Sequence, residues 1–285
     1  MNILSVQSHV AYGYVGNRAA VFPLQRLGHD VWAVNTVQFS NHTGYGSWTG
    51  EVFSAEHVAT VIAGIFERTP LGSCDAVLSG YLGAAALGDA ILDTVARVRA
   101  ANPRAIYACD PVMGDVGRGV FVRPGIPEFF RDKAIPLADI ITPNQFELEL
   151  LTGLTVAGLQ DAIVAARQLL ETGPRVVVVT SLRHAATPAD RIEMLAVAPD
   201  GAWLVATPYL PLDPAPNGAG DAVTALFLAH YLRSRSVRIA LEAMAAAIYE
   251  IIVTTHEAGT RELQLITAQD HLVAPRRTFE AEQVA

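Results

Sequence analysis

The sequence is poor in lysine. Only one of its 20 Lys and Arg residues is a lysine, Lys133, and no Gly-x-x-x-x-Gly-Lys-Ser/Thr string is present. That absence excludes the phosphate-binding loop of P-loop nucleotide hydrolases. The formal net charge is −8 and no basic run is longer than Arg276-Arg277, so a nucleic-acid-binding surface is not expected. If the protein handles phosphate groups, it must do so with backbone amides, arginine or a metal ion.

Cysteines and long hydrophobic runs are also scarce. The two cysteines, Cys74 and Cys109, lie in apolar, strand-like stretches, which favours buried free thiols in a reducing compartment over a disulfide. The N-terminus, residues 1–6, has no basic segment, and its apolar run is too short for that of a signal peptide. The longest apolar stretch, residues 240–253, is interrupted by two glutamates, so no membrane span is predicted. We expect a soluble, cytoplasmic protein.

What the chain does contain is a regular alternation of short apolar runs and helix-length segments. Hydrophobic residues make up 51% of the 285 residues, enough for a substantial core. The predicted strands are residues 2–7, 31–37, 76–79, 105–109, 140–142 and 176–180, followed by a hairpin over 191–197 and 202–206. The predicted helices are residues 17–27, 55–68, 84–100, 146–151, 159–171, 219–232 and 237–256.

This order predicts an α/β fold. The strands are apolar on both faces, which is typical of a parallel sheet covered on both sides. We therefore expect a doubly wound, mostly parallel central sheet with helices on both faces. No linker or internal repeat divides the chain, so residues 1–285 are expected to form a single domain.

Polar residues gather where these strands end. In open α/β sheets, ligands bind beyond the carboxyl ends of the strands, so this edge is the predicted active site. The polar residues follow six strands in turn: Ser8 and His9; residues 38–50; Gly80 and Tyr81; Asp110 and Asp115; Asn144 and Glu147; Thr180 and Ser181.

A glycine-rich turn, Gly218-Ala219-Gly220-Asp221, leads directly into a long apolar segment. The first turn of a helix has unpaired N–H groups and a positive dipole end, which together suit a phosphate. A carboxylate beside a phosphate site is useful if a hydroxyl must lose its proton while it attacks a phosphoryl group. The alternative is an ordinary helix start with Asp221 as a first-turn acid.

Two further groups of carboxylates have both a chemical and a structural interpretation. Asp110 and Asp115 lie five residues apart on a loop with proline and glycine and could converge on Mg²⁺; alternatively, Asp110 caps a turn and Asp115 is solvated. Asn144 and Glu147 have the spacing of a capping box. Glu147 could instead hold metal-bound water near phosphate groups.

The segment from Gln38 to Gly46 is dense in aromatic and hydrogen-bonding side chains, which indicates a pocket for a flat, polar heteroaromatic ring. His9 and His42 have no partner at zinc-site spacing, so zinc is not expected. Cys109 lies inside a strand and is not expected to be a nucleophile.

Over nearly its whole length, and in the same order, the chain resembles pyridoxal kinases of the ribokinase-like superfamily. The strings that carry the resemblance are Ser5-Val6-Gln7-Ser8-His9-Val10, Gly13-Tyr14-Val15-Gly16-Asn17, Val37-Gln38-Phe39-Ser40-Asn41-His42-Thr43, Ser79-Gly80-Tyr81, Cys109-Asp110-Pro111-Val112, Thr142-Pro143-Asn144-Gln145-Phe146-Glu147 and Gly218-Ala219-Gly220-Asp221. Ala219 differs from the residue common in pyridoxal kinases. Because that position supplies mainly its N–H, catalysis should survive the change.

The resemblance implies phosphorylation of the 5′-hydroxymethyl group of pyridoxal by ATP with Mg²⁺, with K⁺ as a candidate additional cation and a homodimer as the assembly. It places Ser8, Val15, Phe39, His42, Thr43, Gly44 and Tyr81 around the substrate ring. It places Asp110, Asp115 and Glu147 at the metal. It assigns the nucleotide to Asp110, Thr142, Asn144, Glu147, Thr180, Ser181, Thr207, Pro208, Tyr209 and Leu210.

In this scheme Asp221 is the general base, which also contacts the substrate, and the backbone of Gly218, Ala219 and Gly220 is the anion hole. Two alternatives remain. One is a hydroxymethylpyrimidine kinase, which would need a different ring pocket. The other is a low-turnover carrier of pyridoxal phosphate, which would tolerate loss of the nucleotide loop.

Overall fold

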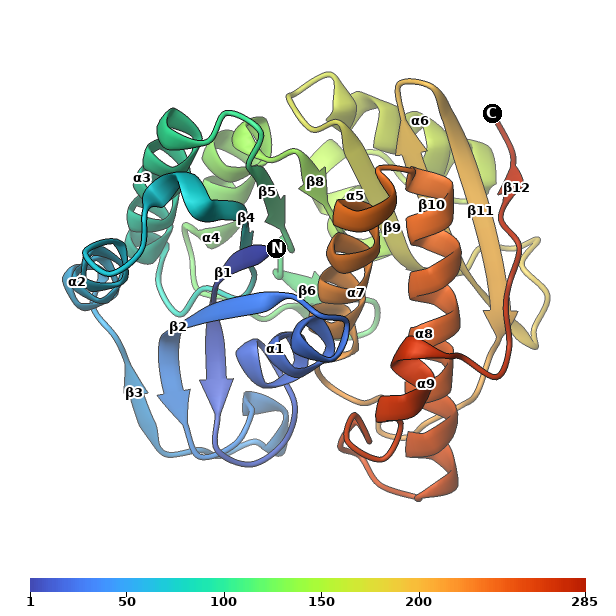
Figure 1. Cartoon of the computed structure of the whole chain (residues 1–285). Helices are drawn as coiled ribbons and strands as arrows, with labels where there is room; N and C mark the ends of the chain where they lie inside the picture. The colour runs from blue at the N-terminus through green and yellow to red at the C-terminus, as the bar shows by residue number, and fades with distance from the viewer.

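A ten-stranded sheet runs through the molecule in the order β12-β11-β10-β9-β8-β5-β4-β1-β2-β3 (Figure 1). The structure is a computed structural model that describes residues 1–285. The six central strands, from β9 to β2 in this order, are parallel to one another, whereas β3 at one edge and β10, β11 and β12 at the other pair in antiparallel fashion. The strands are β1 (Asn2–Val10), β2 (Asp30–Phe39), β3 (Gly50–Val52), β4 (Cys74–Ser79), β5 (Ile106–Cys109), β8 (Ile140–Ile141), β9 (Val176–Leu182), β10 (Arg191–Ala198), β11 (Gly201–Pro208) and β12 (Glu282–Gln283). A separate hairpin pairs β6 (Gly114–Asp115) with β7 (Gly119–Val120).

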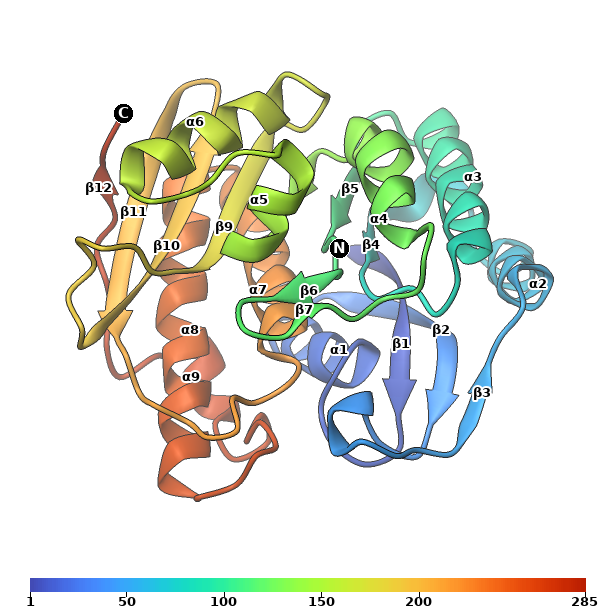
Figure 2. The same cartoon turned by 180° about the vertical axis from the view of Figure 1, so that it is seen from behind.

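Helices cover both faces of the sheet. One face carries α1 (Asn17–Arg26), α7 (Ala219–Ser234), α8 (Val237–Glu257) and α9 (Gln269–Val273), in front in Figure 1. The other carries α2 (Ala55–Phe66), α3 (Ala85–Ala101), α4 (Ile126–Phe129), α5 (Gln145–Thr152) and α6 (Leu159–Leu170), in front in Figure 2. Short 3₁₀ or π turns lie at Thr43–Tyr45, Leu71–Ser73, Phe130–Ala134 and Ile135–Leu137.

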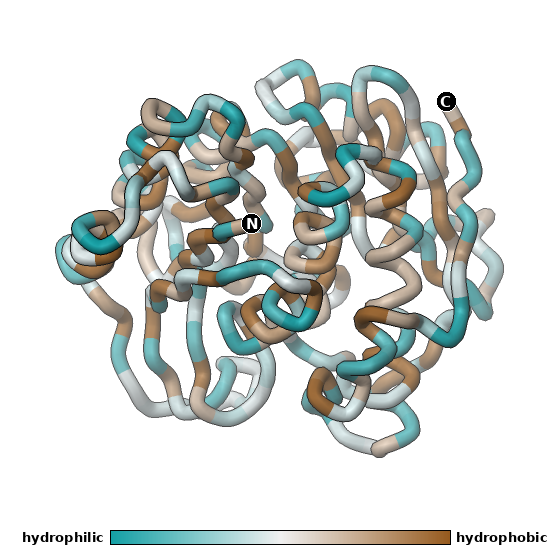
Figure 3. The backbone as a smooth tube through the Cα atoms, in the orientation of Figure 1, coloured by the Kyte–Doolittle hydropathy of each residue, from teal (hydrophilic) through white to brown (hydrophobic).

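The two faces bury hydrophobic cores of nearly equal size, 38 residues on the α7 side and 37 on the α3 side. Figure 3 shows the central strands as predominantly hydrophobic stretches. A strand between two such cores needs apolar side chains on both faces, which explains why these strands show no polar alternation. The predicted doubly wound architecture is confirmed.

The differences from the predicted elements are mostly short pieces. The strands β3, β6, β7 and β12 and the helices α4 and α9 are absent from the prediction. Each spans only two to five residues, too few to show a period of 2 or 3.6. Both cysteines are free and buried, as predicted. No helix combines the length and the hydropathy that crossing a membrane requires.

Four of the polar residues predicted to follow a strand lie inside that strand: Ser8, His9, Gln38 and Ser181. β1 continues to Val10, and the β1–β2 register shifts between Gln7 and His9, around Ser8. In β9 the pairing with β10 shifts around Thr180 and Ser181, and Ser181 has a left-handed φ of 52°. Such irregularities re-aim a side chain at the end of a sheet, so Ser8 and Ser181 reach the site without leaving their strands.

Candidate active site

One large cleft, of about 590 Å³, opens at the carboxyl ends of the parallel strands. It is the place at which ligands bind in open α/β sheets. All the residues to which the resemblance assigns a role contribute to its lining: Ser8, Val15, Phe39, His42, Thr43, Gly44, Tyr81, Asp110, Asp115, Thr142, Asn144, Glu147, Thr180, Ser181, Thr207, Pro208, Tyr209, Leu210, Gly218, Ala219, Gly220 and Asp221. His9 and Gly80, which were also expected at this edge of the sheet, do not line the cleft.

One end of the cleft is apolar. Val10, Val37 and Phe39 form a small buried cluster of their own, against which Val15 packs, and all four line the cleft. Trp48 packs against Phe39 with ring centroids 5.9 Å apart but does not line the cleft. This end can accept one face of a flat ring, with Ser8 and Thr43 as nearby hydroxyl groups.

The glycine-rich turn begins α7 at the centre of the cleft. Gly218 is the N-cap and has a left-handed φ of 89°, and a Cβ at this position would overlap the carbonyl oxygen of Tyr14. Only glycine satisfies both conditions. No side chain caps the helix, so the first amide groups of α7 remain available to an anion.

Asp221 lies in the first turn of α7 and is half-buried; its Oδ1 atom is enclosed and has no hydrogen-bond partner. Burial raises the pKa of this carboxyl group to about 6, against the opposing effect of the Gly16 amide. An ionisable group with a raised pKa in a cleft is typical of a functional site. The group can therefore accept a proton near neutral pH.

Asp110 and Glu147 add two more carboxyl groups beside Asp221. Asp110 is 5% exposed; burial, followed by the charges of Glu147 and Asp221, raises its pKa well above the usual value. Burial likewise raises the pKa of Glu147 to about 7. Acidic groups that repel one another in a dry site are stabilised as anions by a cation, so this part of the cleft suits one.

Glu147 also organises the start of α5. Its Oε2 accepts from the Asn144 amide at 2.9 Å, and the Asn144 side chain accepts from the Glu147 amide at 2.9 Å, which is the capping box expected from the spacing. Oε1 accepts from the Met113 amide at 2.8 Å. Glu147 thus forms the capping box of α5 and also lines the cleft.

The predicted metal residues do not form a complete binding site by themselves. No three His, Cys, Asp or Glu side chains converge closely enough to hold a metal ion. Asp115 is exposed, and its Oδ1 accepts from the next amide, that of Val116, at 2.8 Å. Asp110 and Glu147 fit a Mg²⁺ ion that takes its other ligands from phosphate oxygens and water, as Mg²⁺ usually does.

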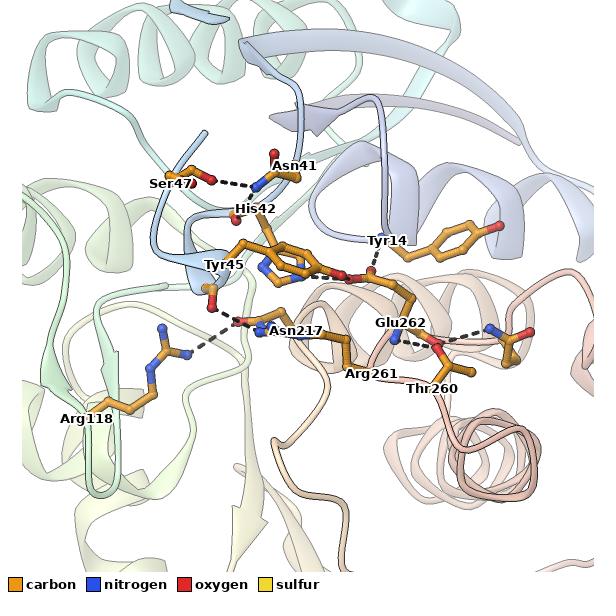
Figure 4. Close-up of polar contacts among 12 residues, drawn as sticks. Tyr14, Asn41, His42, Tyr45, Ser47, Arg118, Asn217, Thr260, Arg261 and Glu262 are labelled. Carbon is orange, nitrogen blue, oxygen red and sulfur yellow. Dashed lines mark hydrogen bonds and ion pairs between the residues drawn. The ribbon is translucent and has the colours of Figure 1, made fainter. Parts of the chain in front are cut away.

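Glu262 is a cleft-side residue that the sequence did not reveal. Its Oε1 accepts from Tyr45 Oη at 2.7 Å and contacts His42 Nε2 at 2.9 Å, and its Oε2 accepts from the Tyr14 amide at 3.1 Å (Figure 4). One carboxylate thus joins the loop after β1, the loop after β2 and the segment after α8. His42 is 220 residues away in the chain, so no local pattern could have indicated the contact.

Two arginines line the cleft beside this cluster. Arg261 donates to the Gly44 carbonyl at 2.9 Å and lies over the Tyr45 ring at 4.1 Å. Arg118, from the β6–β7 hairpin, donates to Asn217 Oδ1 at 3.3 Å (Figure 4). Neither arginine, nor Asn217, was among the predicted site residues.

The opposite end of the cleft contains the residues expected at the nucleotide. Thr180, Ser181 and the end of β11 with Tyr209 line it. Arg183 lies over the Tyr209 ring at 4.2 Å. Residues 183–190 form the loop behind this end. Glu193 of β10 accepts from Thr187 Oγ1 of that loop at 2.8 Å and contacts His184 Nε2 at 3.2 Å.

Comparison with known proteins agrees with this geometry. Residues 29–265 match the family model described as phosphomethylpyrimidine kinase. Pyridoxal kinase PdxY of Rubrobacter xylanophilus is 58% identical over 286 residues, covering 100% of this chain and 98% of that protein. The chain belongs to the pyridoxal kinase family. The PdxY protein of Deinococcus radiodurans is 56% identical, over 99% of this chain and 96% of the relative.

A solved structure supports the same membership. Pyridoxal kinase from Leishmania donovani, in complex with ADP and pyridoxamine, superposes with a TM-score of 0.92 at 32% identity. The match covers 100% of this chain and 99% of that one. The ribokinase-like arrangement expected from the sequence motifs is therefore confirmed by fold as well as by sequence.

Proposed function

We propose that this protein transfers the γ-phosphoryl group of ATP to the 5′-hydroxymethyl group of pyridoxal, giving pyridoxal 5′-phosphate and ADP. The observation that carries the proposal is the position of Asp221, whose unpartnered carboxylate oxygen lies beside the free amides of α7. Asp221, as a proton acceptor, and the amides of α7, as an anion site, thus lie side by side in one cleft. They lie between its apolar end, which can accept a flat ring, and its polar end. The names of the pyridoxal kinase relatives supply the substrate class.

In the reaction, the alcohol oxygen attacks the γ-phosphorus in line with the bond to the bridging oxygen of ADP. The new O–P bond forms as the old one breaks, the alcohol proton passes to Asp221, and ADP leaves with the bond electrons. The amides of Gly218, Ala219 and Gly220 stabilise negative charge on the transferring group. Asp221 acts on a proton that becomes acidic only late in the step, so a weak base suffices.

Asp110 and Glu147 are the groups that would hold Mg²⁺, with Asp115 at the edge of that region. When bound, Mg²⁺ would offset charge on the phosphate oxygens and orient them. The chain's own residues set the geometry: Asn144 fixes the start of α5 and so fixes Glu147. Thr142, Thr180, Ser181 and the segment of Thr207, Pro208, Tyr209 and Leu210 are proposed to bind the nucleotide, because they line the far end of the same cleft.

The substrate ring is proposed to bind at the apolar end, with Phe39, Val15 and Tyr81 around it and Ser8, Thr43, His42 and Gly44 at its polar edge. We also propose that residues 1–285 act as one domain in a cytoplasmic homodimer, with K⁺ as a second cation. The likeness to pyridoxal kinases supports the dimer, and the two buried free thiols fit a reducing compartment.

The test is an ADP-release assay with pyridoxal, pyridoxine, pyridoxamine and hydroxymethylpyrimidine, with mass spectrometry of the products. We expect turnover of pyridoxal and a product heavier by one phosphoryl group. Turnover of hydroxymethylpyrimidine alone would favour the alternative function, a hydroxymethylpyrimidine kinase. Tight binding of a vitamer without ADP release would favour a carrier. Light scattering tests the dimer, and repeating the assay with and without K⁺ tests that ion.

A further inference from the structure

The charges around the cleft are unequally distributed. Four carboxyl groups line it, those of Asp110, Asp115, Glu147 and Asp221, whereas its only Lys or Arg side chains are Arg118 and Arg261. A polyphosphate brought into such a cleft adds further negative charge. The transferring phosphoryl group therefore needs positive charge that the helix start and a cation supply only in part.

Arg261 is not free to supply it. Its guanidinium donates to the Gly44 carbonyl and stacks on Tyr45, and its Nε atom is buried. These contacts commit it to the loop after β2. The single lysine is also excluded, because Lys133 Nζ is paired with Asp89 Oδ1 at 2.7 Å and does not line the cleft.

Arg118 is differently placed. It lies at the tip of the β6–β7 hairpin between Gly117 and Gly119, which have left-handed φ values of 81° and 68° and open space around their α-carbons. Its side chain is exposed. Its one hydrogen bond, to Asn217 Oδ1, is long at 3.3 Å. A guanidinium held this weakly can exchange its partner for a stronger anionic acceptor.

The position of Asn217, the hydrogen-bond partner of Arg118, indicates that this acceptor is an anion bound at the start of α7. Asn217 immediately precedes Gly218, the N-cap of α7, so the guanidinium already lies next to the proposed anion hole (Figure 4). The phenyl ring of Phe121 supports it from behind, with Arg118 Cζ 4.9 Å from the ring centroid. Both side chains line the cleft.

We propose that Arg118 is a further catalytic residue, a hairpin arginine that leaves Asn217 and contacts the phosphoryl group during its transfer from ATP. The inference rests on the proposed kinase function and deepens it. Arg118 takes no proton: the O–P bond to the substrate forms, the bond to ADP breaks, and the alcohol proton goes to Asp221 as before. The guanidinium stabilises charge on the non-bridging oxygens, and its planar fork suits two of them at once.

The test compares Arg118→Gln and Arg118→Lys with Arg104→Gln. Arg104 is exposed in the turn before β5, at the amino ends of the parallel strands, whereas the cleft lies at their carboxyl ends. Replacing it changes the net charge by the same amount as replacing Arg118. We expect Arg118→Gln to lower kcat on the order of 10²–10³-fold, the usual effect of removing one transition-state donor. The KM for pyridoxal should remain unchanged. Arg118→Lys should recover part of the loss because it keeps the charge, and Arg104→Gln should behave as wild type.

A second measurement does not depend on pyridoxal as the substrate. ADP with aluminium fluoride mimics the transferring group, and calorimetry gives its affinity beside that of ADP alone. We expect Arg118→Gln to lose on the order of tenfold to hundredfold in affinity for the mimic, with little change for ADP. Equal kinetics and equal affinity for the mimic in Arg118→Gln and Arg104→Gln would overturn the proposal. A wild-type protein that binds the mimic through Arg118 but does not phosphorylate pyridoxal would overturn only the proposed substrate.

Discussion

Asp221 has one buried, unpartnered carboxylate oxygen beside the amides that begin α7. If this group accepts the alcohol proton, Asp221→Asn should fold normally and lose on the order of 10²–10⁴-fold in kcat, a typical contribution of a general base. Steady-state kinetics and a thermal unfolding curve measure both. A folded Asp221→Asn protein with near wild-type turnover would remove the proposed role.

The same group predicts a pH dependence. Burial raises the pKa of Asp221 to about 6, and a base must be ionised to act. The kcat/KM for pyridoxal should therefore fall as the pH drops through about 6, because protons then occupy the acceptor. A profile that stays level from pH 7.5 to pH 5 in the wild-type protein would contradict this assignment.

Burial, followed by the charges of Glu147 and Asp221, raises the pKa of Asp110 well above its usual value. If it helps to hold Mg²⁺, Asp110→Ala should raise the Mg²⁺ concentration needed for half-maximal activity by about tenfold or more, since a cation site loses a charged ligand. Asp115→Ala, at the exposed edge of the same region, should change it less. Superimposable Mg²⁺ titrations of wild type and Asp110→Ala would exclude Asp110 from the cation site.

The N-terminus of α5 links helix stability to the cleft. Asn144 accepts from the Glu147 amide and donates to the Gly114 carbonyl at 2.8 Å, so it holds both α5 and the β6–β7 hairpin. Asn144→Ala should lower the free energy of unfolding by about 1–2 kcal/mol and raise the KM for ATP. Urea unfolding and kinetics test the two effects.

Ser236→Ala is the matched control, because Ser236 caps α8 through the Ile239 amide at 3.3 Å and does not line the cleft. It should lose about 1 kcal/mol or less and keep the wild-type KM. If Asn144→Ala also kept the wild-type KM, its role would be that of a helix cap alone.

Glu262 fixes three segments around the end of the cleft that is proposed to bind the substrate. In Glu262→Ala, His42, Tyr45 and the Tyr14 amide lose their acceptor. We expect the free energy of unfolding to fall by about 2–4 kcal/mol. The KM should rise for pyridoxal more than for ATP, because the loops that move are on the substrate side. Glu257→Ala, on the exposed end of α8, is the control. Equal increases in both KM values would argue against a local effect on the substrate loops.

The elements that the sequence predicted are those with enough length to show a pattern. The strands β1, β2, β4, β5 and β9 are apolar because two cores enclose them. A strand that is apolar on both faces has consecutive apolar residues, which the sequence shows directly. Ser8 and Ser181 depart from this pattern: the register shifts that turn them into the cleft depend on pairing with β2 and β10. Pairing partners are distant in the chain, so a local reading ends the strands too early.

The location of the cleft could be predicted from the sequence because its residues follow successive strands, and the parallel topology brings the carboxyl ends of those strands together. Glu262 and Arg118 did not follow. Glu262 contacts His42 across 220 residues of sequence, and Arg118 lies in a hairpin whose strands have two residues each. In both cases the position depends on tertiary contacts rather than on local periodicity.

The buried carboxyl groups should make the stability of the ligand-free protein depend on pH in a defined direction. Burial raises the pKa of Glu147 to about 7 and that of Asp221 to about 6, so the folded state binds more protons than the unfolded state. Their contribution to stability is therefore fully present below about pH 4 and is lost as the pH rises through 6 and 7.

The variant Asp221→Asn/Glu147→Gln removes these two groups. In EDTA and without nucleotide, its free energy of unfolding minus that of wild type should increase from pH 5 to pH 8, by about 1 kcal/mol or more. Taking the difference cancels the groups that both proteins share. A difference that stays constant or decreases with pH would show that these carboxyl groups are not protonated in the folded protein.

Glu262 is also the latest in the chain of the side chains that hold the cleft together. A nascent polypeptide emerges from the ribosome in order, so the carboxyl groups of Asp110, Glu147 and Asp221 appear well before Glu262, which joins His42 and Tyr45. Partly synthesised molecules would lack the contacts that join the loops after β1 and β2 at this end of the cleft. These contacts can therefore form only after most of the chain has been translated.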